Sequence, residues 1–216
     1  GLVILGGSIE DGIEKERMVT VKGLAEMEVP ANKVTWPLMY KEVGNDLTAL
    51  YNRINATNTA IVEFLKKKGI TEEEISINAP EIIDMQAERY VGENKTYRYN
   101  VTTVITVTSA KVDLVRSLIS EQSELLKQGI AITGGDYRYQ IQYDYTSLNE
   151  IKPKMIEEAT KNAREAALKF AKDSDSELGK IRRASQGQFS IDNRDANTPY
   201  IKRIRVVTTI DYLLED

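Results

Sequence analysis

One short run carries carboxylates at alternate positions, as calcium-binding loops do: Asp173-Ser174-Asp175-Ser176-Glu177. Such a loop also needs a glycine at its sixth position and a bidentate glutamate at its twelfth. Counted from Asp173, Gly179 stands seventh and Ala184 stands twelfth, so neither requirement is met. We therefore predict that the acidic run is a polar cap and turn after a helix.

Histidine and cysteine are both absent from the 216 residues. Their absence removes the commonest general base, the soft metal ligands and the thiolate nucleophile. No Ser-x-x-Lys, Gly-x-Ser-x-Gly or phosphate-loop spacing occurs, and Gly6-Gly7 and Gly134-Gly135 are interpreted as turns. We expect no catalytic, cofactor-binding or metal-binding residues and no enzyme; any bound metal would have oxygen ligands. A hydrolase would need two converging carboxylates, which no spacing indicates.

A tyrosine-rich segment is the first candidate for an interaction face. Between positions 137 and 145 the residues alternate, which predicts a strand with the tyrosines on one side. Tyrosine suits interfaces because its ring is apolar and its hydroxyl tolerates water. The alternative is a sheet face covered by a helix, with the hydroxyls at its rim. The tyrosines of this face are Tyr137, Tyr139, Tyr143 and Tyr145.

Basic residues in the last two predicted strands are the second candidate. Arg182, Arg203 and Arg205 lie among further lysines and arginines there. Such a face could receive an anion, a lipid headgroup or an acidic partner. The alternative is a solvated sheet face with cross-strand charge pairs. Because the chain has 29 basic and 33 acidic residues, a net charge of −4, we exclude a general nucleic-acid binder.

Hydrophobic periodicity predicts the elements that hold these residues. Period-two alternation indicates strands at 18–29, 34–43, 75–85, 95–109, 137–145, 179–190 and 202–212, the first two forming a hairpin. Helical spacing indicates three main helices: one following an N-cap at Asn45, one over 112–126, and one over 150–172 with Pro153 in its first turn. The order predicts an α+β fold, with a largely antiparallel sheet in ββα-type units and helices packed on it.

The beginning of the chain is apolar from Gly1 to Ile9 and charged from Glu10 to Arg17. Nine residues are too few to span a bilayer. Two interpretations stay open: the remnant of a signal or membrane anchor, or a short packed segment of the fold. We favour residues 1–16 as an anchor remnant plus linker, and 17–214 as the folded domain, with two pseudo-related lobes as one arrangement.

The order of several short motifs resembles the bacterial SIMPL-domain family. The opening strand at residues 17–29 (RMVTVKGLAEMEV) has its V-x-V-x-G signature, and Lys68-Gly69-Ile70 closes the helix that follows. Downstream come Tyr97-Arg98-Tyr99, an alanine-rich helix and Leu178-Gly179-Lys180-Ile181. The resemblance covers about residues 17–214.

This resemblance implies an exported protein, periplasmic or tethered to the membrane through its N-terminus, in an envelope or stress role. It also implies a homo-oligomer, and it supplies no catalytic residues or cofactor. From it we expect a non-enzymatic envelope protein that acts by self-assembly or partner binding. The alternative is a small-molecule or peptide-binding module that uses the tyrosine-rich or basic face.

Overall fold

The computed structural model describes residues 3–7, 17–87 and 97–216, the first range as backbone only. The chain divides into two compact units. Unit 1 contains Gly1–Pro30 and Tyr145–Asp216, and unit 2 contains Ala31–Asp144. Each has its own sheet, and every strand pairing within the described residues is antiparallel. The predicted α+β class is therefore confirmed.

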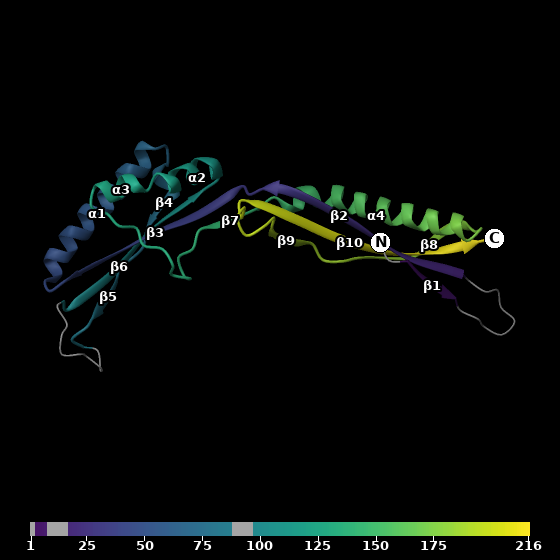
Figure 1. Ribbon diagram of the computed structural model, residues 1–216, viewed down its shortest axis with the longest axis horizontal. Helices are drawn as coiled ribbons and strands as arrows, with labels where there is room; N and C mark the ends of the chain where they lie inside the picture. The colour runs from purple at the N-terminus through teal and green to yellow at the C-terminus, as the bar shows by residue number, and fades with distance from the viewer. Residues whose placement is uncertain (1–2, 8–16, 88–96) are drawn as a thin grey trace. The chain divides into compact units, whose positions relative to one another are not determined.

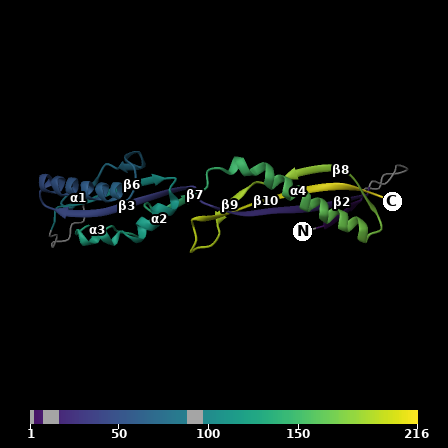
Figure 2. The ribbon, with the colours of Figure 1, turned by 90° about the horizontal axis from the view of Figure 1, so that it is seen from above.

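Unit 1 is a twisted sheet with one long helix on one face (Figures 1 and 2). The strands follow the order β1-β2-β10-β8, and β9 also pairs with β10. The helix, α4, packs against β2 and β10. The elements are β1 (Val3–Gly7), β2 (Arg17–Pro30), α4 (Leu148–Asp173), β8 (Glu177–Gln186), β9 (Ser190–Asn193) and β10 (Ile201–Glu215).

The close approach of α4 to β2 depends on small residues. Gly23 lies on the buried face of β2, and a Cβ built there would lie 1.9 Å from the Ala159 carbonyl oxygen and 2.5 Å from the Ala163 nitrogen. Ala159 and Ala163 are themselves fully buried. Only glycine therefore allows the helix backbone to lie this close to the strand. The alanine stripe of the predicted third helix is confirmed as the face that packs on the sheet.

Unit 2 places its helices on one face of a second sheet, of order β4-β6-β3-β7, with β5 also paired to β6 (Figure 1). We call the other face the open face. The strands are β3 (Lys33–Gly44), β4 (Ile75–Ile77), β5 (Glu81–Asp84), β6 (Tyr99–Ser109) and β7 (Gln142–Asp144). The helices are α1 (Leu47–Lys67), the 3₁₀ turn η1 (Glu72–Glu74), α2 (Val112–Ser120) and α3 (Ser123–Lys127).

The helix-covered face of unit 2 holds its core. Trp36 and Leu38 of β3 and Ile105 of β6 are at most 2% exposed there. Helix α1 begins at the N-cap Asp46, whose side chain accepts from the Thr48 N–H at 3.0 Å. It ends at Lys67, and Gly69, with a φ of +106°, then reverses the chain. The predicted helix and its glycine stop are confirmed, but Asn45 is not the cap.

Several expected elements differ from the structure. Segments 18–29 and 34–43 do not form a hairpin: β2 pairs with β1 and β10, whereas β3 pairs with β6 and β7. The pattern of alternation identifies a strand but not its partner. The helix expected over 112–126 is two helices, α2 and α3. Pro153 lies in the second turn of α4, because that helix already begins at Leu148.

Near the N-terminus, Val3–Gly7 forms β1 and pairs with Arg17–Val21 of β2. The backbone of this apolar segment is therefore part of a sheet. The interpretation of residues 1–16 as an anchor remnant plus linker stays a prediction, and residues 8–16 lie outside the described residues.

Candidate interaction surfaces

A loop that we call the strap, residues 133–141, leaves one edge of β3 and returns to it. Thr133 donates its N–H to the Met39 carbonyl oxygen at 2.8 Å, and the chain pairs with β3 again only at β7. Between these points lies Pro37 of β3, which has no N–H to donate. The strap turns at Gly134-Gly135, where Gly135 has a φ of +90°. This stretch of β3 has no strand partner on the β7 side in the described structure.

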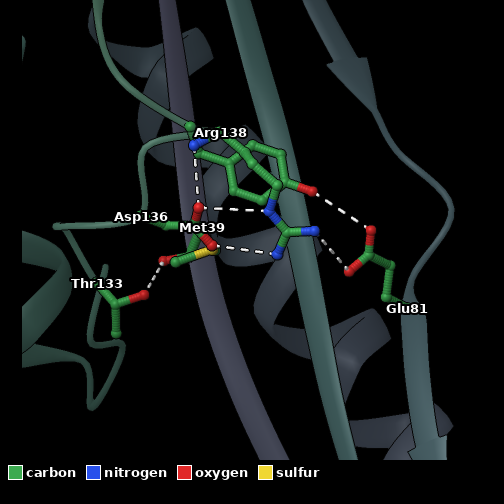
Figure 3. A network of polar contacts seen from close by, with 6 residues as sticks. Met39, Glu81, Thr133, Asp136 and Arg138 are labelled. Carbon is green, nitrogen blue, oxygen red and sulfur yellow. Dashed lines mark hydrogen bonds and ion pairs between the residues drawn. The ribbon is translucent and has the colours of Figure 1, made fainter.

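Figure 3 shows the polar network of the strap, with Arg138 between Asp136 and Glu81. Asp136 accepts two bonds from the Arg138 guanidinium, at 3.3 and 3.1 Å, and one from its backbone N–H at 2.9 Å. These bonds hold the pKa of Asp136 below its usual range. Arg138 also lies 3.8 Å from Glu81 of β5, and the Tyr139 hydroxyl donates to the other Glu81 oxygen at 3.4 Å.

The contact with Glu81 shows that the strap crosses the open face of unit 2. Glu81 is opposite Thr102 of β6, which is opposite Lys41 of β3. The side chains of Arg138 and Tyr139 therefore extend over β3 and β6 to reach β5. Below it, Met39 and Val104 are directly opposite each other and only 3% and 4% exposed. Apolar side chains on the uncovered side of a sheet would normally be solvated, so their burial reflects this cover.

A groove of about 610 Å³ runs between the strap and β3. Lys41 and Met39 line it from β3, and Thr133 to Arg138 line it from the strap. Tyr137 at its rim is 83% exposed. The groove combines the exposed Tyr137 ring, the cations of Lys41 and Arg138, and the Asp136 carboxylate.

The four tyrosines of the predicted face lie in different places. Only Gln142–Asp144 of the expected strand is a strand, so the prediction of one alternating strand over 137–145 is wrong. Tyr137 and Tyr139 are in the strap, Tyr143 is in β7, and Tyr145 packs beside a core cluster of unit 1. Their role in interactions stays a prediction. Glycines and Asp136 favour a turn here, and this signal outweighs the alternation.

The predicted basic residues lie on the sheet of unit 1. Arg203 of β10 is 3.9 Å from both Glu26 and Glu28 of β2, on the face away from α4. These contacts fit the alternative of a solvated face with cross-strand charge pairs. Arg205 lines a separate groove of about 530 Å³ with Lys22 and Leu24. Arg182 lies in β8 and has interactions of its own.

Two edges of the unit 1 sheet are open. Strand β8 ends the sheet and is exposed at eight of its ten residues. On the opposite side, the described residues of β1 pair with β2 as far as Val21. Beyond it, the Leu24 carbonyl oxygen accepts from the Asn162 side chain of α4 at 2.8 Å, which caps one backbone group of that edge.

The structure describes no group of three or more carboxylates able to hold a metal ion in residues 17–87 and 97–216. The acidic run at 173–177 closes α4 and leads into β8, as a turn in which Asp175 has a φ of +53°. Sequence reasoning missed Asp136, Arg138 and Glu81. The Gly-Gly-Asp turn signal identifies the strap, but no local signal places Glu81 beside it.

A family model described as SIMPL, protein of unknown function (DUF541), matches residues 19–206. The chain belongs to the SIMPL family. The match includes residues of both units, among them the whole of α4. A search of curated proteins finds no match to the chain.

The described part of this SIMPL domain has no helix with the length and apolar character needed to cross a bilayer.

Proposed function

We propose that this SIMPL-family protein is a non-enzymatic envelope protein that acts by self-assembly or partner binding through open sheet edges. The observation that carries the proposal is β8, an exposed strand of ten residues at the end of the unit 1 sheet. The absence of histidine and cysteine supports a role without catalysis.

The backbone of β8 presents donors and acceptors to solvent. The N–H of Gly187 donates to the Val207 carbonyl oxygen of β10 at 2.7 Å. Since bonded positions alternate along an antiparallel ladder, Ser185 also points its backbone groups to β10, and Ala184 and Gln186 point theirs outward. Unpaired outward groups of this kind recruit another strand.

The charged end of β8 limits where a strand can add. Lys180, Arg182 and Arg183 lie in its first part, where the register with β10 shifts. Charges and bulges both discourage edge pairing. The regular, uncharged stretch from Ala184 to Gln186 is therefore the part of β8 best suited to receive a strand.

Proline substitution tests this edge with a matched control. Ala184→Pro removes an outward N–H and leaves the ladder to β10 intact, whereas Ser185→Pro removes an inward donor. If β8 mediates assembly, sedimentation velocity will show that the wild-type chain associates with rising concentration and that Ala184→Pro weakens association without lowering the melting temperature. Ser185→Pro will lower the melting temperature.

A wild-type chain that stays monomeric at the highest attainable concentration would contradict self-assembly. Association that Ala184→Pro leaves unchanged would exclude the β8 edge and direct the search to β2.

The location of the protein is a separate part of the proposal. The family resemblance supports an exported protein, periplasmic or anchored by its N-terminus, with a role in stress physiology. Protease added to intact spheroplasts of cells that express the native gene should digest the protein while a cytoplasmic marker survives. Protection equal to that of the marker would refute export.

The second candidate function is binding of a small molecule or peptide in the groove beside the strap. The exposed Tyr137 ring at its rim favours it. A pocket shared by Tyr137, Tyr139 and Arg205 would have supported this function further, but Arg205 lines a groove in unit 1 instead. A thermal-shift screen in which a compound stabilises the wild type and not Tyr137→Ala would support the binding role. A screen without any stabilising compound would count against it.

A further inference from the structure

We propose that the strap is a lid, which opens while the rest of unit 2 stays folded and thereby exposes an apolar patch on the open face. The patch consists of Met39 and Val104, together with the unpaired edge of β3 at Pro37.

The tethers of the strap are few and exposed. Its contacts with Glu81 are a hydrogen bond of 3.4 Å from Tyr139 and an ion pair of 3.8 Å to Arg138. The side chains of Arg138 and Glu81 are 49% and 55% exposed, so water competes for both. Segments held by exposed polar contacts of this kind open at a lower free energy than the global unfolding of the domain.

The strap also has a hinge. A Cβ at Gly134 or Gly135 would meet no atom within 4 Å, so neither residue is packed against the sheet. Gly135 has a φ of +90°, a region that glycine enters without strain. The bidentate pair of Asp136 and Arg138 lies wholly within the strap and would move with it. Among the described residues, the contacts with Glu81, the Thr133 bridge and the burial of Met39 and Val104 resist opening.

The patch under the strap differs from the rest of the buried apolar surface. Leu38, the neighbour of Met39 along β3, is fully buried on the opposite face, under the helices. Exposing Leu38 requires unit 2 to lose its core, whereas exposing Met39 requires only the strap to move. The two adjacent positions therefore distinguish local opening from global unfolding.

The absence of cysteine makes the test direct, because an introduced thiol is the only one in the chain. We would prepare the full chain with Met39→Cys or Leu38→Cys and measure the reaction rate with an aromatic disulfide reagent under native conditions. Trp36, the single tryptophan, is 2% exposed in the unit 2 core and reports global unfolding in the same samples.

A lid predicts that the thiol of Met39→Cys reacts faster than unit 2 unfolds, and that the thiol of Leu38→Cys does not. Adding Glu81→Ala, which removes both tethers to β5, should accelerate only the first reaction, by roughly fivefold for about 1 kcal/mol of lost contact. Glu73→Ala, at an exposed glutamate of η1, is the matched control and should change neither rate.

Equal rates for the two thiols, each matching the loss of Trp36 fluorescence, would overturn the proposal. An equal acceleration of both thiol reactions by Glu81→Ala would also overturn the proposal, since general destabilisation of unit 2 acts on both positions alike. If Met39→Cys does not fold, Val104→Cys probes the same patch from β6 with the same expected results.

Discussion

Glu74 fastens the turn after α1 to the end of β6, and its protonation should weaken unit 2. One carboxylate oxygen accepts from the Thr71 N–H, the Thr71 hydroxyl and Lys111 Nζ, each at 3.0 Å. Lys111 also donates to the Gly69 carbonyl oxygen at 3.1 Å. The Glu74 side chain is only 16% exposed. Three donors on one partly buried oxygen strongly favour the charged form.

The size of the effect follows from the pKa of Glu74. Burial acts to raise this pKa, but hydrogen bonds from Ser109, Thr71 and Lys111 outweigh burial and lower it from 4.5 to about 2. This lowering corresponds to about 3 kcal/mol of folding free energy. Because the folded-state pKa lies below the unfolded one, the stabilisation is complete above pH 4.5 and is lost as the pH falls towards 2.

The assay is urea unfolding followed by Trp36 fluorescence, which reports on unit 2. At pH 7 we expect Glu74→Gln to lose about 2–3 kcal/mol of unfolding free energy relative to wild type. The difference should shrink between pH 4.5 and 2, because Glu74 takes up a proton first in the unfolded and then in the folded chain, which removes the charge that glutamine lacks. Glu73→Gln, at the exposed neighbouring glutamate, should unfold like wild type at every pH.

Two results would refute this reasoning. If Glu74→Gln has wild-type stability at pH 7, the carboxylate does not hold the turn. If the loss is the same at pH 7 and pH 3, the charge of Glu74 is irrelevant and the loss comes from altered packing alone.

Further predictions concern packing in unit 1 and a buried hydroxyl in unit 2. Gly23→Ala should destabilise unit 1 by about 2 kcal/mol or more in urea unfolding followed by circular dichroism, since its Cβ would lie 1.9 Å from the Ala159 oxygen. Gly134→Ala, which meets no atom within 4 Å, should change stability by less than about 0.5 kcal/mol, and equal losses would refute the packing argument. Burial raises the pKa of Tyr40 to about 12, so an absorbance titration should show one tyrosine that ionises at unusually high pH. Tyr40→Phe should remove this step. The neutral hydroxyl of Tyr40 stabilises unit 2 below pH 10, and this contribution should fade as the pH rises to 12; a titration unchanged by Tyr40→Phe would contradict the assignment.

The sequence by itself determined the elements whose signals are local. The alternation of apolar and polar residues located β2 and its buried face. Side chains of a strand point alternately to its two faces, whichever strand it pairs with. The glycine at position 69 and the lysines before it placed the end of α1. The alanine stripe of α4 was evident as well, since helical spacing and small side chains are both visible in sequence.

Only the tertiary structure decided which elements meet. The strands β2 and β3 are neighbours in sequence yet belong to different sheets, because the partner of a strand depends on burial across the whole unit. Tyr139 of the strap contacts Glu81, which is 58 positions earlier in the sequence. Gly23 must be glycine because of its contact with α4, far along the chain. Such contacts are set by long-range packing, which leaves no periodic trace in the sequence.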